Sequence, residues 1–288
     1  MDWWQALLLG VVQGLTEFLP VSSSGHLMIV RELLGVDGEG FLDFTVTVHF
    51  ATVIATLVVF WKEIWALLKG FFKFRYNDET DYIFKILVSC IPVLIVGVFF
   101  KDAVEGLFGD ALLPVGFGLC FTAAILLWSD FAGKKKAAPA AEAVEAKAEA
   151  KSDAPAAGEV RNGITYWQAL LVGIGQAIAV APGVSRSGTT IATGLVSGVK
   201  RSVMAQFSFL MVLIPIVGEQ FLDLLKAFLE GGGFGGAVGI LPLVLGFVAA
   251  FFSGLFACKA MVALVRRARL GWFALYCFIV AILIFIFA

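Results

Sequence analysis

The chain has 288 residues, of which 60% are hydrophobic and only 15% charged, and its mean hydropathy is +0.95. A water-soluble fold could not bury that much apolar surface, so the composition excludes aqueous globular classes and indicates a polytopic membrane protein. The net charge of −1 gives no basic field that would favour nucleic acid as a partner. The four cysteines stand in apolar stretches without CxxC spacing, which predicts small core side chains: Cys90, Cys120, Cys258 and Cys277.

The first predicted unit covers residues 1–132. It begins with a broken apolar stretch, 2–34, which is interrupted near its middle by Pro, Gly and Ser in "LPVSSSGH". Three stretches long enough to cross a bilayer follow, because about 20 helical residues span its apolar core: 44–61, 83–100 and 111–130. The interruption predicts two short half-helices joined by a loop, in place of one continuous span.

A segment of different composition separates the two halves of the chain. Residues 133–163 are rich in Ala, Lys, Glu and Pro and have few large apolar side chains. Such a segment cannot bury enough apolar surface to fold alone. We therefore expect a solvated cytoplasmic linker there.

The second predicted unit covers 164–288 and has the same order of elements. A broken stretch at 165–199, interrupted at "APGVSRSG", precedes three spans at 203–222, 238–260 and 270–288. Interrupted apolar segments at corresponding positions of two halves favour re-entrant helix pairs, which are tolerated at membrane depth where the loop lines a protein cavity. Full spans kinked at proline are the alternative.

Self-comparison shows that the two halves are an internal repeat. Trp4–Gly25 aligned without gaps on Trp167–Gly188 gives 11 identities in 22 positions. Three spans and one re-entrant pair per half make an odd number of crossings, so the second copy must be inverted relative to the first. The predicted fold is an all-α polytopic membrane protein with an inverted-topology repeat, six transmembrane helices and two re-entrant pairs.

Basic residues orient this arrangement, because cytoplasmic loops collect Lys and Arg. If residues 1–43, 101–110 and 223–237 lie outside, all the basic clusters lie inside: Lys62, Lys69, Lys73 and Arg75; the "KKK" of the linker; Lys200 and Arg201; Arg266, Arg267 and Arg269. Both termini are then external, and the two broken pairs enter from opposite faces and can meet near the midplane.

Polar side chains gather around the first interruption. Gln13 and Glu17 are four residues apart and share one helical face that ends at the break. Burying such groups in a membrane is costly, so they indicate function, although Glu17 as a neutral structural carboxyl and His26 as a structural histidine remain alternatives. The hydroxyls and the imidazole that follow are Ser22, Ser23, Ser24 and His26.

The second interruption supplies a cation. In the alignment Arg186 takes the place of Ser23, so the first copy offers acid and base and the second offers a guanidinium. If the loops meet, Arg186 can bind a multiply charged oxyanion with its planar fork. Neighbouring hydroxyls and freed backbone N–H groups at the start of a half-helix can hold further oxygens: Ser185, Ser187, Gly188, Thr189 and Thr190.

Two stretches, "QGLTEFLPVSSSGH" and "PGVSRSGTT", resemble the two signature motifs of the undecaprenyl-diphosphate phosphatase family of bacitracin resistance proteins. The similarity runs through essentially the whole chain, with the 133–163 linker as the main departure. It implies a multi-pass enzyme of the bacterial inner membrane, with an outward-facing active site, that hydrolyses C55 isoprenyl diphosphate to the monophosphate. The lipid carrier of peptidoglycan synthesis would thereby be recycled and bacitracin resisted.

The resemblance also implies a divalent cation, Mg²⁺ or Ca²⁺. Gln13 stands where the family accepts Glu or Gln, which puts a two-carboxylate metal scheme in doubt and leaves Glu17 as the sole carboxylate that could bind the metal. Glu17, with or without His26, would activate Ser23 or water, and Arg186 would neutralise phosphate charge. The other motif side chains would bind substrate: Gln13, Ser22, Ser24, Ser185, Ser187, Gly188, Thr189 and Thr190.

Several alternatives stay open at the level of sequence. The sequence does not decide between a phosphoseryl intermediate on Ser23 and direct attack by water, and we slightly favour the serine. Inverted repeats with broken helices also describe transporters, so carriage of an anionic lipid or solute is the alternative function. The expected partners are the C55 isoprenyl diphosphate and membrane lipids, without nucleic acid, and a homodimer is left open.

Overall fold

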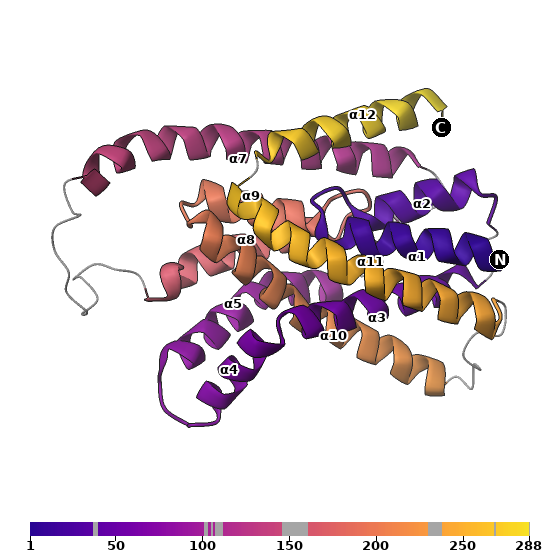
Figure 1. Ribbon diagram of the computed structural model, residues 1–288, viewed down its shortest axis with the longest axis horizontal. Helices are drawn as coiled ribbons and strands as arrows, with labels where there is room; N and C mark the ends of the chain where they lie inside the picture. Colours follow the sequence, from indigo (N-terminus) through magenta and orange to yellow (C-terminus); the bar gives the residue numbers. More distant parts are fainter. Residues whose placement is uncertain are drawn as a thin grey trace.

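The computed structural model describes residues 1–36, 40–100, 103–104, 106, 112–145, 161–229, 238–267 and 269–287. Every regular element in these ranges is a helix, as the sequence predicts (Figure 1). The elements are α1 (Trp3–Phe18), α2 (Ser23–Leu33), α3 (Phe41–Val59), α4 (Trp61–Phe71), α5 (Asp78–Phe99), α7 (Leu113–Glu145), the 3₁₀ turn η1 (Arg161–Gly163), α8 (Tyr166–Ile178), α9 (Arg186–Val196), α10 (Arg201–Leu229), α11 (Ile240–Arg267) and α12 (Gly271–Phe287).

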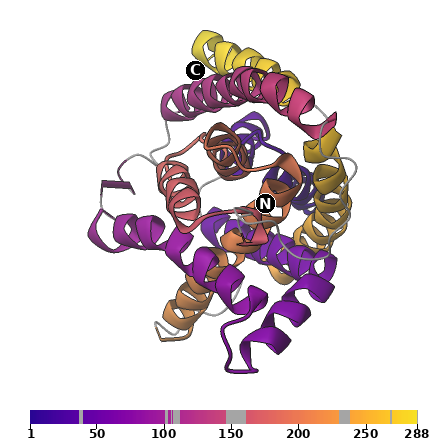
Figure 2. The same ribbon diagram turned by 90° about the vertical axis from the view of Figure 1, so that its left-hand side faces the viewer.

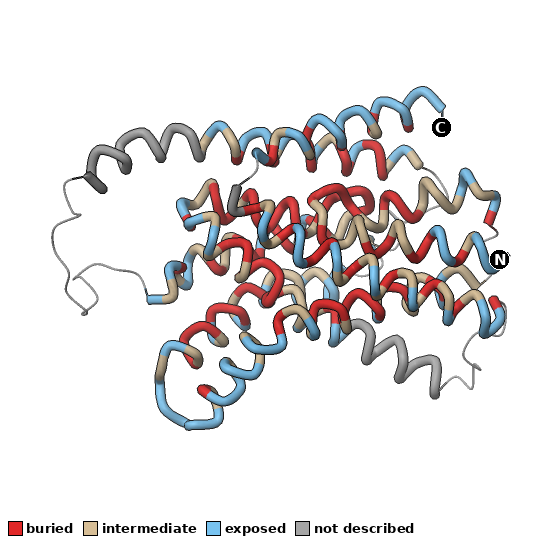
Figure 3. Tube along the Cα trace, in the orientation of Figure 1, coloured by how far each residue is buried: buried red, intermediate tan, exposed pale blue. Residues whose placement is uncertain are grey.

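Five of the described helices contain a stretch long and apolar enough to cross a membrane. These stretches are Phe41–Val59, Asp78–Phe99, Leu113–Ala132, Arg201–Gly218 and Ile240–Val265. The sixth expected span corresponds to α12, which is apolar but has only 17 residues. Many large apolar residues of these helices are exposed. Buried residues are concentrated toward the inside of the bundle (Figure 3). The chain is therefore a multi-pass helical membrane protein.

The helix before the linker runs into the segment that separates the two halves. Helix α7 continues to Glu145, so the first residues of the predicted 133–163 linker extend the preceding helix. Its Ala, Lys and Glu residues explain this, because these residue types have high intrinsic helix propensity. Residues 146–160 of the linker lie outside the described part of the chain.

The described part of the second half begins at η1, where a cluster of charged and polar groups lies beside the start of α5. Lys85 Nζ donates to Asp81 Oδ2 at 2.6 Å and to the Arg161 carbonyl at 2.8 Å. Asn162 Nδ2 donates to Asp81 Oδ2 at 2.9 Å, and Arg161 pairs with Asp78. Asp81 and Lys85 are both buried, and burial of such charges is tolerated because each is paired. These bonds fix η1, and with it the start of α8, against α5.

Each half begins with a hairpin of two short helices, α1–α2 and α8–α9, at the positions of the predicted broken pairs. The same bond closes both hairpins at their open ends. Gln5 Nε2 donates to the Leu34 carbonyl and Gln168 Nε2 to the Ser197 carbonyl, each at 3.1 Å. Both glutamines also accept a bond from the residue that precedes their helix. The repeat seen in the sequence is thus a repeat of local structure.

The hairpins lie at the centre of the molecule, and longer helices surround them (Figure 2). Each hairpin packs against the other half, because α1 lies on α11 and α8 lies on α5. Glycine permits the close approach at equivalent positions of the two contacts. A Cβ on Gly10 would lie 2.4 Å from the Gly246 carbonyl, and one on Gly173 would lie 2.2 Å from the Ser89 carbonyl. The halves therefore hold each other's hairpins in place.

Replacing Gly173 by Ala should destabilise the protein, because the new methyl group overlaps the backbone of α5. Overpacking of this kind costs about 1–3 kcal/mol. Gly97→Ala is the matched control on α5, since a Cβ there meets nothing within 4 Å. We expect the melting temperature of the purified protein in detergent to fall for Gly173→Ala and to stay constant or rise for Gly97→Ala. Equal melting temperatures would contradict the close crossing.

Candidate active site

The tips of the two hairpins touch inside the helix bundle. Ser187 Oγ donates to the Leu19 carbonyl at 3.2 Å, across 168 positions of sequence. A Cβ on Gly188 would meet Pro20 at 3.2 Å, and one on Gly25 would meet Gly183 at 3.4 Å. The structure therefore brings the two interrupted motifs together into one composite site, on helices that approach from opposite ends of the molecule (Figure 1).

A serine caps the second helix of each hairpin. Ser22 Oγ accepts a hydrogen bond from the Gly25 N–H at 3.3 Å, and Ser185 Oγ accepts one from the Gly188 N–H at 3.2 Å. These serines begin α2 and α9 inside the protein, where the first N–H groups of a helix need partners. Both helix N-termini, with their partial positive charge, thus lie at the place where the loops meet.

Helices α7 and α12 support the loops from outside. The Ser185 N–H donates to Thr122 Oγ1 at 2.9 Å, so α7 holds the loop that precedes Arg186. Cys277 Sγ, on α12, contacts the Pro20 carbonyl at 3.6 Å. Cys277 is free and buried, as predicted for a small core side chain. The two loops are therefore fixed by packing against equivalent helices of the repeat.

Glu17, in the last turn of α1, is the centre of the polar contacts. Its Oε2 accepts hydrogen bonds from Gln13 Nε2 at 2.8 Å and from Ser23 Oγ at 2.6 Å. Because two donors converge on one oxygen, the arrangement suits an ionised carboxylate better than a neutral carboxyl group. Ser23, in the first turn of α2, is thereby held with its hydroxyl hydrogen toward a base.

Glu17 and Arg186 both line two adjoining cavities. The more polar cavity is lined by Thr16, Glu17, Ser22, Ser23, Ser24, His49, Ala179, Val184, Ser185 and Arg186. The more apolar one is lined by Glu17, Phe18, Thr52, Val53, Thr56, Arg186, Ser187, Ser208, Phe209, Val212, Leu213 and Ile216. The carboxylate of Glu17 and the guanidinium of Arg186 thus lie where the polar cavity meets the apolar cavity; these two cavities are called the polar and the apolar chamber below.

Other side chains that the sequence singles out lie outside both cavities. Thr190 Oγ1 is bonded to Ser208 Oγ at 2.6 Å, while Gly188 and Thr189 are buried in α9. Gln13 is also fully buried and reaches the site only through its bond to Glu17. These residues support the shape of the site and do not line the chambers.

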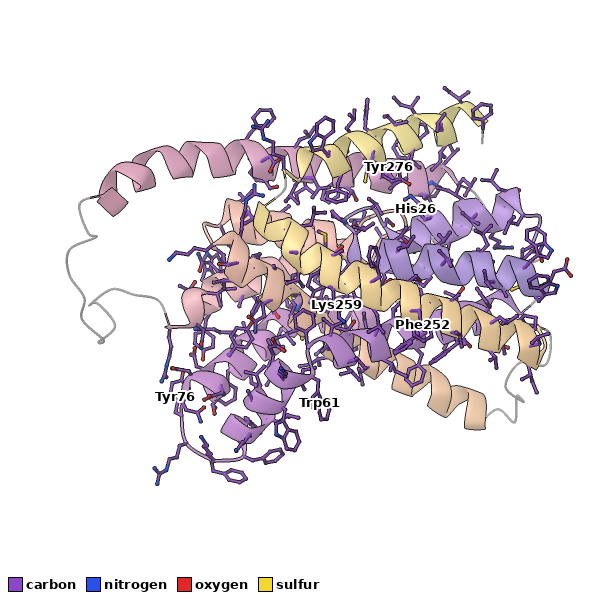
Figure 4. All side chains as sticks on the ribbon, in the orientation of Figure 1. His26, Trp61, Tyr76, Phe252, Lys259 and Tyr276 are labelled. Atoms are coloured by element: carbon purple, nitrogen blue, oxygen red, sulfur yellow. The ribbon has the colours of Figure 1, made fainter. Side chains whose placement is uncertain are left out.

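His26 is held away from the cavities by two hydrogen bonds. Its Nδ1 lies 2.8 Å from the Ser22 carbonyl and its Nε2 lies 2.7 Å from the Tyr276 hydroxyl. The imidazole also stacks on the Tyr276 ring, with centroids 5.6 Å apart (Figure 4). With both ring nitrogens engaged, His26 ties α2 to α12 in this structure.

His49 is a cavity residue that the sequence reasoning missed. It lies on α3, with Nε2 3.7 Å from Glu17 Oε2. The signal was present, because a histidine inside an otherwise apolar span is uncommon unless it serves a purpose. Its distance from both motifs in the sequence concealed the connection.

The chain is similar to proteins of one family over nearly its whole length. The family model described as "Bacitracin resistance protein BacA" matches residues 6–283. An undecaprenyl-diphosphatase of Bacteroides fragilis is 48% identical over 282 residues, covering 98% of this chain and 97% of the relative. One from Parabacteroides distasonis is 48% identical over 277 residues, covering 96% and 95%. One from Carboxydothermus hydrogenoformans is 34% identical and covers 99% and 97%.

Proposed function

This chain belongs to the bacitracin resistance protein BacA family, and we propose that it is a membrane phosphatase that hydrolyses undecaprenyl diphosphate to undecaprenyl phosphate and inorganic phosphate. This activity recycles the lipid carrier for peptidoglycan synthesis and confers bacitracin resistance. The observation that carries the proposal is the 2.6 Å bond from Ser23 to Glu17 in a cavity that Arg186 also lines. A nucleophile, a base and an anion-binding group are thereby assembled in one place.

The cation and the helix ends neutralise the substrate's charge. Cleavage of a phosphoanhydride needs stabilisation of charge on the nonbridging oxygens, and fixed positive groups supply it without reorganising. Arg186 offers a planar fork that can contact two phosphate oxygens at once. The N-termini of α2 and α9 add backbone donors beside it.

Glu17 serves as the proton acceptor. When Ser23 Oγ attacks the terminal phosphorus, its proton passes to Glu17 Oε2, and the bridging oxygen leaves with the bonding electrons as lipid monophosphate. Water then attacks the phosphorus and the bond to Ser23 Oγ breaks. Ser23 recovers its proton from Glu17, and both hydrogens of the water remain with the released phosphate. Direct attack by a water molecule placed in the same cavity is the alternative, and there Glu17 would accept the water proton.

A divalent cation, Mg²⁺ or Ca²⁺, is part of the proposal. When bound, it would neutralise phosphate charge alongside Arg186. Among the described residues no three His, Cys, Asp or Glu side chains come together to hold an ion alone. One carboxylate, Glu17, fits the chemistry of a cation that takes its remaining ligands from substrate phosphates and water, as Mg²⁺ commonly does.

The apolar chamber suits the beginning of the prenyl chain. Its walls come mainly from α3 and α10, through side chains such as Val53, Phe209 and Ile216. A diphosphate bound between Glu17 and Arg186 would direct its first isoprene units into this chamber. A transporter would need no hydroxyl bonded to a carboxylate, so the Ser23–Glu17 pair favours the phosphatase over the alternative of a carrier.

The membrane arrangement completes the proposal. We place α3, α5, α7, α10, α11 and α12 as spans of the bacterial inner membrane, with α1–α2 and α8–α9 as re-entrant pairs from opposite faces. Both chain termini lie at one end of the molecule, which fits an even number of crossings (Figure 1). The positive-inside rule puts that end outside the cell, so the site opens outward.

The proposed activity is tested by measuring phosphate release from undecaprenyl diphosphate by the purified protein. The wild type should release phosphate, and Glu17→Gln should lose activity by about 10²-fold or more, because it keeps size and hydrogen bonding but loses the base. An unchanged melting temperature controls for folding. An inactive wild type would refute the function, and a variant within threefold of wild type would refute the role of Glu17.

Arg186→Lys should be nearly as damaging as Arg186→Ala. A single ammonium group cannot reproduce a planar contact to two phosphate oxygens, and loss of one such contact costs about 10²–10³ in rate. The measurement is kcat for each variant with the same lipid substrate. If the lysine variant kept most of the activity, Arg186 would act only as a diffuse charge.

The orientation is tested with single cysteines in a variant without the four native ones. Glu32, near the end of α2, and Lys73, just after α4, are both exposed. Helix α2 lies toward the end of the molecule that carries both termini, and α4 lies toward the other end (Figure 1). We expect Glu32→Cys to react with a membrane-impermeant maleimide in intact cells and Lys73→Cys to react only after permeabilisation. The reverse pattern would show that the site opens to the cytoplasm.

A further inference from the structure

The chain contains two histidines, and the structure uses them differently. Both bring Nδ1 to a backbone carbonyl one helical turn back: His26 to Ser22 at 2.8 Å and His49 to Thr45 at 2.9 Å. The Nε2 of His26 is taken up by Tyr276 outside the cavities. The Nε2 of His49 faces the polar cavity and makes no hydrogen bond to a described residue.

The bond to Thr45 fixes the tautomer of His49. A carbonyl oxygen only accepts, so Nδ1 carries the hydrogen and a neutral ring presents its lone pair at Nε2. A histidine that binds a metal almost always donates its other ring N–H to a carbonyl, a carboxylate or water. His49 has this arrangement, with the free nitrogen directed toward the carboxylate of Glu17.

The carboxylate also has a free donor atom. Gln13 and Ser23 both bind Glu17 Oε2, and Oε1 accepts no hydrogen bond from a described residue. A cation lying about 2.1 Å from each of two ligand atoms can join atoms up to about 4.2 Å apart. His49 Nε2 lies 3.7 Å from Glu17 Oε2, the oxygen to which Gln13 and Ser23 donate; this distance is inside that limit and brings the imidazole within reach of a cation bound to the carboxylate.

We propose that His49 is the second protein ligand of the active-site cation, which is held between the imidazole of α3 and the Glu17 carboxylate of α1. The inference rests on the proposed function, because the diphosphate supplies the other ligands. It puts one carboxylate and one imidazole in place of the two-carboxylate scheme that Gln13 puts in doubt. Carboxylate, phosphate and water ligands suit Mg²⁺, Ca²⁺ and Mn²⁺ alike, and Mn²⁺ also accepts imidazole, so Mn²⁺ is the probe with which this coordination is tested.

The test is pulsed electron paramagnetic resonance of Mn²⁺ bound to the purified full-length protein together with a non-hydrolysable prenyl methylenediphosphonate. A directly bound imidazole nitrogen produces ¹⁴N modulation of the electron spin echo. We expect this modulation in the wild type and in His26→Gln, and its loss in His49→Gln and His49→Leu. The affinity for Mn²⁺ should fall about tenfold or more in His49→Leu.

Isotope labelling keeps the test independent of any folding defect. Wild-type protein grown with [¹⁵N]histidine should show ¹⁵N in place of ¹⁴N modulation, and His26→Gln labelled in the same way should give the same spectrum. Bound Mn²⁺ without nitrogen modulation, modulation that survives in His49→Gln, or no Mn²⁺ binding by the wild type would each overturn the proposal. Phosphate release by the wild type is measured separately, so failure of the phosphatase function is distinguishable.

Discussion

The site depends on keeping one carboxylate charged in the middle of an apolar helix bundle. Glu17 is almost entirely shielded from solvent, and a carboxylate in such a place needs hydrogen-bond donors and a nearby cation. The donors come from Gln13 one turn earlier and from Ser23 across the loop, while Arg186 comes from the other half of the chain. Neither half supplies a complete environment for this charge, so the hairpins must meet.

The repeat supplies the frame, and divergence between its copies supplies the chemistry. Equivalent glutamines, capping serines and close-contact glycines hold the same backbone twice. The side chains differ where the two hairpin tips meet. In the alignment of the two halves, Glu17 corresponds to Val180 and Ser23 corresponds to Arg186. A symmetric site with two carboxylates or two guanidinium groups would repel itself. Divergence makes the charges complementary where the halves touch.

Sequence patterns predicted the local parts of this arrangement and missed those set by distant contacts. The hydropathy pattern predicted the spans, and the Pro, Gly and Ser interruptions predicted the hairpins. Both predictions depend only on residues that are neighbours in the sequence. The role of His26 as a bond to α12 depends on Tyr276, 250 positions away, and could not be read from the motif that contains it. His49 lines the cavity because α3 packs beside α1. The spacing of residues in the sequence does not predict this packing.

The junction of two chambers explains why the reacting groups stand where they do. A prenyl diphosphate is polar at one end and apolar along the rest, and its scissile bond lies in the headgroup near that boundary. Glu17 and Arg186 line both chambers, so they mark the corresponding boundary in the protein. Burial of the first isoprene units against Val53, Phe209 and Ile216 would then fix the depth of the phosphates. In the proposed reaction, binding energy from the tail would thereby orient the headgroup toward Ser23.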